Sequence, residues 1–389
     1  MSNYSDSVKL VFPLIYQYLL TSSLQGKFFI VSWIILLNDV EPCESVIYFP
    51  EWLDGILNIY TESNTLLQND IKKLLDLYLR SIADYHEKVD VSKIFDVLYL
   101  HVNSDRNSIF VLVIQVKLVS FDWILAFLEL FKCQITPFIP IIYGVIYKHL
   151  VSPYPVSERC TRINAKLKTL ACLADSQPFD FFLFADILKK SLRVKNNQVI
   201  LSALDWYSIL VDKFTRQIWP HVDHFFDSIL DLLQQDSNVV KSSIFVLTTI
   251  ANQIDVPKNY LTPFLKGIVE TFLADDDLSL LKSQGPFIVE NILNNLDGVK
   301  FFTEISKIII ETAKKDVIGL VVYHLNVMLL TMDQTSGFRT HLITSDKVRL
   351  AVTDRIGKCF RQCLKVGPII LHQLFPFAFY AVNIISHTK

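Results

Sequence analysis

A short apolar pattern recurs along the chain at intervals of about forty residues. The pattern consists of two bulky apolar residues, a spacer, a usually small or acidic residue and two more apolar residues. The clearest copies are Trp52–Leu57, Ile141–Ile146, Phe225–Leu230 and Phe264–Val269, and weaker copies occupy 14–19, 94–99 and 183–188. The fourth positions of the copies are residues 17, 55, 97, 144, 186, 228 and 267. A fixed period of this length is typical of repeat architectures, in which each repeat is one supersecondary unit.

Each copy of the pattern is predicted to lie on a helix. Around the copies, apolar residues recur at i, i+3, i+4, i+7 and i+11, which is the stripe of a 3.6-residue period. A proline at or near the start of several copies predicts where these helices begin, because proline is tolerated in the first turn. These prolines are Pro50, Pro140, Pro220 and Pro263. Between the copies we expect a second helix, for example over residues 66–83.

The length of the repeat, its pairing of helices and one short segment favour HEAT-type repeats. Tetratricopeptide and ankyrin repeats have shorter periods, of about 34 and 33 residues. One second helix begins with Asp236–Lys241, a segment that resembles the start of a HEAT repeat's second helix. The predicted fold class is therefore all-α, a HEAT-type helical-repeat superhelix or α-solenoid. Stacking of helix pairs into one continuous core accounts for a hydrophobic content of 51%.

The pattern becomes less regular toward the C-terminus. Residues 332–345 are predicted to form a loop, followed by helices near 346–364 and 368–386. The stretch 366–388 contains no charged residue and is long enough to span a bilayer. It also contains Pro368, His372, Gln373, Pro376, Asn383 and His387, and polar groups in hydrocarbon are costly unless they are paired. We interpret it as a buried terminal helix, and a tail anchor remains the alternative.

Composition excludes several classes of function. The net charge is −2, and basic residues are mixed with acidic ones, so a nucleic-acid footprint is not expected. The 10 glycines are scattered and form no phosphate-binding loop. The 6 cysteines include no Cys-x-x-Cys pair, and they are expected to be reduced cytosolic thiols. The N-terminus lacks the features of a secretory signal, and the mature chain is expected to start near residue 1.

Isolated residues that could support chemistry are better explained by structure. His221 and His224 begin a repeat helix and lack a third ligand, so we interpret them as polar-face or groove residues. Cys359 and Cys363 are predicted to lie on one helical face, where burial explains them. The acidic run 275–277 is expected to be an inter-helix turn that caps the next helix. We therefore predict no catalytic residue, no cofactor and no metal site, and hence a protein that is not an enzyme.

Four short segments resemble the vacuole-morphology scaffold family, Vac14, in order and approximate spacing. The first runs from Phe29 to Ile34 and the second from Phe49 to Gly55. The third is Gly285–Ile288 and the fourth is Leu325–Thr331. The motif positions, to which no role is assigned, are Phe29, Ile30, Ser32, Trp33, Pro50, Asp54, Gly55, Gly285, Pro286, Phe287, Ile288 and Asn326.

The resemblance implies a non-enzymatic scaffold for enzymes that control phosphatidylinositol 3,5-bisphosphate. The implied partners are a FYVE-type phosphoinositide kinase and a Sac-domain phosphatase. In that family the kinase-binding repeats come first, and this chain is expected to begin after them, as an N-terminally reduced member. The implied location is cytoplasmic, peripheral on endosomal or vacuolar membranes through the partners, and self-association is a further expectation.

The sequence thus predicts two regions, a HEAT-repeat array over 1–256 and C-terminal repeats over 257–389. The second region resembles the family's phosphatase-binding and self-assembly part. An alternative of a different kind stays open, namely a generic HEAT-repeat adaptor in trafficking or nuclear transport.

Overall fold

The computed structural model describes residues 11–21, 23–61, 64–103, 110–174, 179–253, 257–274 and 279–311, and scattered positions between 321 and 340. All the secondary structure in these described ranges is helical. The chain divides into two compact units, 1–187 and 188–389. The predicted all-α helical-repeat fold is therefore confirmed. The predicted division at residue 257 concerns function and stays a prediction.

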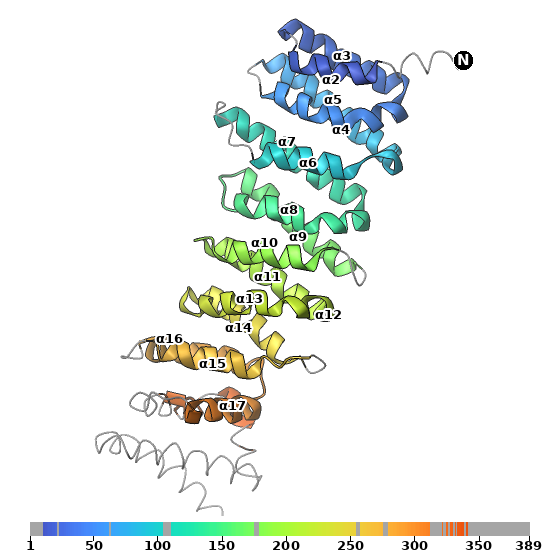
Figure 1. The fold of residues 1–389 in the computed structure, drawn as a ribbon. Helices are drawn as coiled ribbons and strands as arrows, with labels where there is room; N and C mark the ends of the chain where they lie inside the picture. The colour runs from blue at the N-terminus through green and yellow to red at the C-terminus, as the bar shows by residue number, and fades with distance from the viewer. Residues whose placement is uncertain are drawn as a thin grey trace, which may run out of the picture. The chain divides into compact units, whose positions relative to one another are not determined.

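The first unit contains four helix pairs arranged in two layers (Figure 1). The first helices of the pairs are α2 (Phe12–Thr21), α4 (Pro42–Tyr60), α6 (Val91–Asn103) and α8 (Ile139–Ile146). The second helices are α3 (Leu24–Val40), α5 (Thr65–Asp84), α7 (Phe110–Leu130) and α9 (Val156–Leu173). Each layer is continuous, because α4 packs between α2 and α6, and α5 packs between α3 and α7. Short 3-10 helices occupy His86–Lys88, Lys132–Phe138 and Tyr147–His149.

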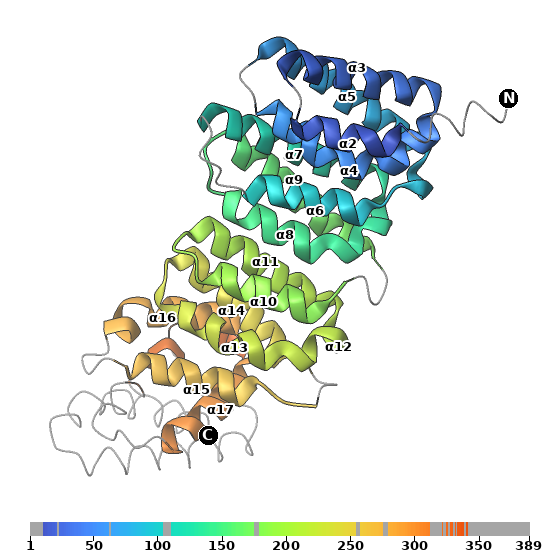
Figure 2. The same cartoon turned by 45° about the horizontal axis from the view of Figure 1, so that its top comes forward.

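Helix α10 (Phe181–Leu192) contains the boundary between the units. The second unit continues with α11 (Asn197–Lys213), α14 (Ser237–Ala251) and α16 (Ser279–Leu293) as one layer. The other layer holds α13 (Val222–Leu230), α15 (Leu261–Phe272) and α17 (Gly298–Glu311). The short helix α12 (Thr215–Ile218) and 3-10 helices at Trp219–His221 and Asp231–Gln234 flank α13, and another 3-10 helix lies at Asp333–Thr335. Figure 2 shows the same helices from a second direction.

Every copy of the forty-residue pattern lies on a first helix. Its fourth position falls on α2, α4, α6, α8, α10, α13 and α15 in turn. At three copies this position is a glycine close to a neighbouring first helix. A Cβ atom on Gly55 would lie 3.1 Å from the Leu19 side chain, and one on Gly267 would lie 2.8 Å from Leu230. The small residue in the pattern therefore allows neighbouring repeats to approach closely.

Second helices begin with side-chain caps that their sequences supply. The side chain of Asn64 accepts a hydrogen bond from the Leu67 N–H before α5, and Asn196 caps α11 in the same way. Asp236 accepts a hydrogen bond from the Asn238 N–H at 3.2 Å and caps α14. Such caps satisfy backbone donors that the helix itself cannot satisfy. The Asp236–Lys241 segment is thus confirmed as the start of a second helix.

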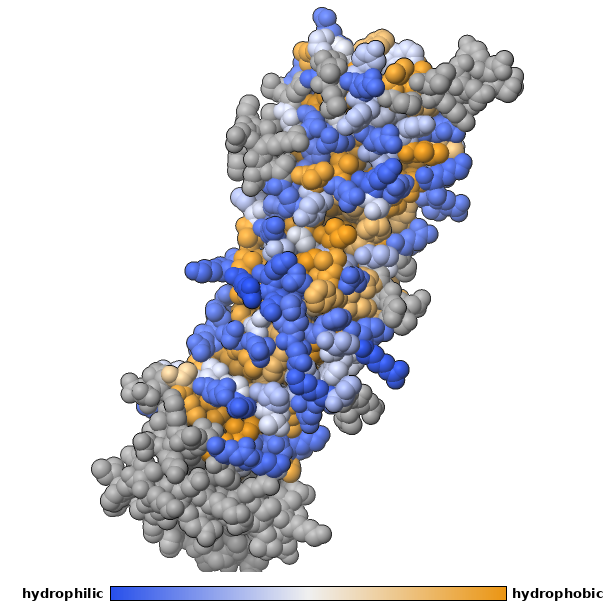
Figure 3. Space-filling view, in the orientation of Figure 1, coloured by the Kyte–Doolittle hydropathy of each residue, from blue (hydrophilic) through white to orange (hydrophobic). Residues whose placement is uncertain are grey.

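The core of each unit is formed by aromatic and aliphatic side chains between the layers. In the first unit, the Phe49 ring stacks on Tyr78 at 4.2 Å between centroids and on Trp123 at 5.3 Å. In the second unit, Tyr207 stacks on Phe225 at 4.2 Å. On the face in Figure 3, hydrophilic and apolar residues are intermingled over the described part of the chain. None of the helices in the described part of the chain meets the length and apolarity needed to cross a bilayer.

Two local predictions were wrong. Pro50 does not begin a helix but lies inside α4, which starts eight residues earlier at Pro42, because residues such as Val46 extend the buried apolar stripe toward the N-terminus. The expected loop at 332–345 is helical at its described positions, 333–337 and 340. There the buried Thr335 hydroxyl donates to the Leu329 carbonyl at 2.7 Å, and the Thr340 hydroxyl donates to the Ser336 carbonyl, so these side chains bond to the local backbone.

Several expectations concern residues outside the described ranges. These are the acidic turn at 275–277, the helices near 346–364 and 368–386, the uncharged stretch 366–388, and the pair Cys359 and Cys363.

Candidate functional site

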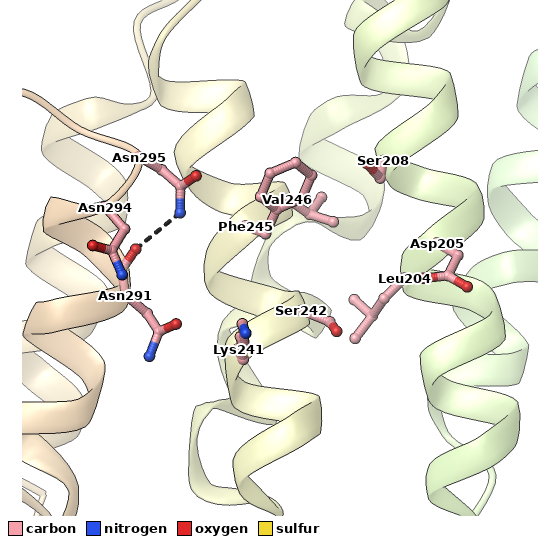
Figure 4. Close-up of a pocket in the computed structure, with 10 residues that line it drawn as sticks. All are labelled: Leu204, Asp205, Ser208, Lys241, Ser242, Phe245, Val246, Asn291, Asn294 and Asn295. Atoms are coloured by element: carbon pink, nitrogen blue, oxygen red, sulfur yellow. Dashed lines mark hydrogen bonds between the residues drawn. The ribbon is translucent and has the colours of Figure 1, made fainter.

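The second unit carries a groove formed by three successive second helices. Helix α14 lies in the middle, with α11 packed on one side and α16 on the other (Figure 4). The groove has a volume of about 370 Å³, which is within the range of about 300–1,000 Å³ that is usual for ligand sites. Its lining consists of Leu204, Asp205 and Ser208 from α11, Lys241, Ser242, Phe245 and Val246 from α14, and Asn291, Asn294 and Asn295 at the end of α16.

The floor of the groove is apolar. Leu204 and Val246 are buried, whereas the Phe245 side chain keeps 46% of its surface exposed. An aromatic ring that is half exposed inside a groove offers a large apolar contact to a ligand. The ring of Phe245 and the side chain of Val246 lie between the α11 side and the α16 side of the site (Figure 4).

The α16 end of the groove carries three asparagines within five residues. The amide of Asn291 donates to the Phe287 carbonyl at 2.7 Å, and that of Asn295 donates to the Asn291 carbonyl at 2.9 Å. Asn252 of the preceding repeat donates to the Asn295 carbonyl at 2.6 Å and so joins the ends of α14 and α16. These bonds use amide N–H groups and leave the side-chain carbonyl oxygens as acceptors at the groove.

One cation and one carboxylate complete the lining. Lys241 is exposed and, within the described ranges, has no acidic side chain at ion-pair distance. Asp205, the carboxylate, already takes part in an interaction within the chain. The site can therefore offer a positive charge, amide and hydroxyl groups, and an aromatic surface, which together suit recognition of another molecule by contact.

The family-motif residues lie on helices of both units. Phe29, Ile30, Ser32 and Trp33 lie on α3, where Ile30 is buried and the Phe29 and Trp33 rings contact each other edge-on at 5.9 Å. The Ser32 hydroxyl is occupied by a hydrogen bond to the Phe28 carbonyl.

The remaining motif positions fall on α4 and α16. Pro50, Asp54 and Gly55 lie on α4, where Asp54 contacts His101. Gly285, Pro286, Phe287 and Ile288 lie on α16, one turn before the asparagines, and Asn326 is outside the described residues. Among these positions, Phe287 accepts a hydrogen bond from the groove residue Asn291 at its backbone carbonyl.

The two histidines that were considered as metal ligands from the sequence lie around the start of α13. His221 and His224 are half-buried around the start of α13, and nowhere in the described ranges do three or more metal-ligating side chains meet. Between them in sequence, Asp223 accepts hydrogen bonds from Lys258 at 2.6 Å and from the Tyr260 hydroxyl at 2.7 Å. These two donors lower the pKa of the Asp223 carboxyl and tie α13 to the segment before α15.

Sequence reasoning did not find the groove. Its residues come from three helices about forty residues apart, and only stacking brings them together. Two signals were present in the sequence. One is the group Asn291, Asn294 and Asn295, and the other is Lys241, which ends the segment that indicated a HEAT-type second helix.

The C-terminal part of the chain matches a family model. Residues 278–371 match the model described as "Vacuolar protein 14 C-terminal Fig4p binding". The described part of this match includes α16 and α17, and hence the asparagine side of the groove.

Curated relatives extend the similarity over most of the chain. The chain is 24% identical to a Protein VAC14 homolog of Arabidopsis thaliana over 312 residues, which are 80% of this chain and 40% of that protein. It is 22% identical to the Protein VAC14 homolog of Schizosaccharomyces pombe, covering 85% of this chain and 48% of the relative.

The chain is also 24% identical to the Vacuole morphology and inheritance protein 14 of Saccharomyces cerevisiae, over 60% of this chain and 27% of that protein. The chain thus spans less than half the length of these curated relatives. A solved structure of an engineered protein aligns over 91% of this chain and 94% of its own, with 13% identity and a TM-score of 0.33.

Proposed function

We propose that this chain, a member of the Vac14 family, is a non-enzymatic scaffold in the phosphatidylinositol 3,5-bisphosphate pathway that binds a Sac-domain phosphatase. The observation that carries the proposal is the match of residues 278–371 to a family model whose description names Fig4p binding. Four ordered segments that resemble the same family also support it, and two of them, Phe29–Ile34 and Phe49–Gly55, lie outside the matched region.

The repeat architecture is suited to such a role. Stacked helix pairs form extended surfaces, and binding at them depends on shape and on side chains from successive repeats. In the matched region, α17 carries Lys300 and Lys307 on its exposed side, and Lys307 pairs with Glu304 one turn earlier. These charges are accessible to a partner that docks on the C-terminal repeats.

The finer form of the proposal adds a second enzyme. A FYVE-type phosphoinositide kinase is held by the same scaffold, so that synthesis and hydrolysis of the lipid occur in one complex. The chain then reaches endosomal or vacuolar membranes through its partners. Support for the kinase and for this location comes from the family resemblance.

Co-purification of the full chain with the Sac-domain phosphatase of the same organism tests the first part. We expect a stable complex, and we expect Lys307→Glu to weaken it. A matched control is Lys73→Glu on α5, because Lys73 pairs with Asp70 at the same i,i+3 spacing in the first unit. Absence of the phosphatase from complexes purified from the native cell contradicts the proposal.

The same purification distinguishes the finer proposal. If the phosphatase co-purifies and no phosphoinositide kinase does, the two-enzyme scaffold is wrong while phosphatase binding stands. Enrichment of nuclear-transport or trafficking factors without either lipid enzyme favours the generic adaptor instead.

A further inference from the structure

The groove between α11, α14 and α16 lies partly inside the region matched to phosphatase binding. The side chains that line it indicate what kind of ligand it binds. We propose that it binds an extended, acidic segment of the Sac-domain phosphatase. This inference rests on the proposed function and deepens it, because it assigns one contact surface and one kind of ligand to the scaffold.

The charge of the ligand follows from Lys241. This side chain is the only basic group in the lining, and it lies on the middle helix with no acidic partner among the described residues. Asp205 is already engaged in a contact of its own. A carboxylate on the ligand pairs with Lys241 and forms a charge-assisted hydrogen bond there.

The extended conformation of the ligand follows from the amide and hydroxyl groups. Asn294 is exposed at the groove, and Asn291 and Asn295 keep their side-chain carbonyl oxygens as acceptors after donating to their own helix. An asparagine amide carries the same donor and acceptor as a peptide bond. In an extended chain the backbone N–H and C=O groups are not used internally, so they can pair with these amides and with the hydroxyls of Ser208 and Ser242.

The length of the segment follows from the helix spacing. A chain that crosses from α11 to α16 covers two interaxial distances of about 8–10 Å each. At about 3.3–3.6 Å per residue, this requires roughly five or six extended residues. An apolar side chain of the segment packs on Phe245, which is 46% exposed above the buried Leu204 and Val246.

A phosphoinositide headgroup fits the same groove poorly. Several phosphates in one headgroup require several cations, and the lining offers one lysine and no arginine. The observations therefore favour a peptide over a lipid.

Affinity measurement with full-length proteins tests the proposal. The dissociation constant of the scaffold–phosphatase complex is measured for the natural chain and for Lys241→Glu and Phe245→Ala. We expect the dissociation constant to rise at least tenfold in each of the two variants. Lys266→Glu on α15 is the matched control, because it makes the same charge change at an exposed position of the other layer, and we expect less than a twofold effect.

Circular dichroism and the melting temperature establish that the variants are folded. If Lys241→Glu and Phe245→Ala bind like the natural chain, the groove proposal is overturned while the proposed function stands. If the natural chain does not bind the phosphatase, the proposed function itself fails. The two failures are therefore distinguishable.

Two further measurements address the ligand. A photo-crosslinking amino acid at position 294 is expected to label a phosphatase segment that contains Asp or Glu, and labelling of a segment without acidic residues overturns the charge assignment. Flotation with vesicles of phosphatidylcholine containing phosphatidylinositol 3,5-bisphosphate is expected to give equal binding for the natural chain and Lys241→Glu. Loss of vesicle binding in Lys241→Glu with unchanged phosphatase affinity assigns the groove to the lipid and overturns the proposal.

Discussion

Nε2 of His101 lies 2.8 Å from Oδ1 of Asp54, although the two residues are 47 positions apart in the chain. The contact joins α6 to α4, two neighbouring first helices. His101 is only 4% exposed, so the Asp54 carboxylate meets its ring nitrogen at a position largely shielded from water. Asp54 also accepts a hydrogen bond from Asn58 at 3.2 Å, which holds the carboxylate in place.

Asp54→Ala is expected to lower the free energy of unfolding by about 1–3 kcal/mol, because it removes a hydrogen bond between a carboxylate and a buried ring nitrogen. Denaturant unfolding followed by circular dichroism measures the change. Glu51→Ala is the control, since Glu51 is exposed on the same helix. If Asp54→Ala and Glu51→Ala have equal free energies of unfolding, the contact with His101 does not contribute to stability.

The glycines of the repeat pattern are expected to respond differently to substitution. At Gly55 a Cβ atom would lie 3.1 Å from Cβ of Leu19, which cannot move away without its backbone. Gly55→Val is therefore expected to destabilise the chain by about 1–3 kcal/mol. At Gly144 a Cβ atom meets Ile187 at 3.4 Å, an ordinary contact.

Gly144→Ala is the matched comparison for this prediction. Alanine is favoured over glycine inside a helix by up to about 1 kcal/mol, so we expect unchanged or higher stability. Melting temperatures of both variants provide the measurement. A fall of the same size in both variants contradicts the assignment of Gly55 to a close helix contact.

The two residues that form a buried hydrogen bond between α3 and α5 are expected to be strongly coupled in their effects on the free energy of unfolding. Nδ2 of Asn38 donates to Oγ of Ser81 at 2.8 Å, and Oδ1 of Asn38 has no partner among the described residues. Ser81→Ala alone removes the acceptor and is expected to cost about 1–3 kcal/mol. Adding Asn38→Leu removes the unsatisfied amide, and the double variant is expected to recover most of this loss.

A double-mutant cycle built from unfolding free energies measures this coupling. Strictly additive changes in the free energy of unfolding would contradict the prediction, because residues that share a buried hydrogen bond are not expected to act independently.

Thiol reactivity is expected to differ between two cysteines of α9. Burial raises the pKa of the Cys160 thiol to about 12, so very little thiolate forms near neutral pH. Cys172 is exposed on the same helix. Alkylation at pH 8 mapped by mass spectrometry is expected to label Cys172 and to reach Cys160 only after denaturation. Equal labelling rates in the native chain contradict the buried position of Cys160.

The same thiol predicts a loss of stability at alkaline pH. Below pH 9 the Cys160 thiol is protonated in both the folded and the unfolded chain, so its contribution to stability is fully present. Above pH 9 the unfolded chain releases the proton first, and stability falls by up to about 1.4 kcal/mol per pH unit until the folded thiol also ionises near 12. Unfolding free energies of the natural chain and Cys160→Ala between pH 8 and 10 check this, and we expect a shallower pH slope in the variant.

Much of the fold could be predicted because its signals are local. The stripe of Val222, Phe225 and Ile229 identifies a helix from a short stretch of sequence, and the forty-residue period then predicts the layers. The start of α14 could also be predicted from the sequence, because the side chain of Asp236 caps the helix. Pro50 was misread because a proline is compatible with a first turn, and only the packing of Val46 reveals that α4 began earlier.

The groove could not be predicted because its residues lie far apart in the sequence. Lys241 and Asn294 are 53 positions apart in the sequence, and their proximity depends on how α14 and α16 stack. The family motifs likewise identify helices rather than a site. Asp54 was singled out by resemblance alone, and its contact with His101 could not be read from the spacing of the two residues.

The glycine contacts have a consequence for how such a chain can evolve. Copies of the pattern carry Gly55, Gly144 and Gly267 at a position where other copies carry Gln17, Val97 or Asp186. Loss of one forty-residue unit by unequal recombination, for example α4 with α5, would place Val97 in the position where Gly55 now meets Leu19. The modules are alike in sequence pattern but not interchangeable, so gain or loss of a repeat requires compensating substitutions in the adjacent ones.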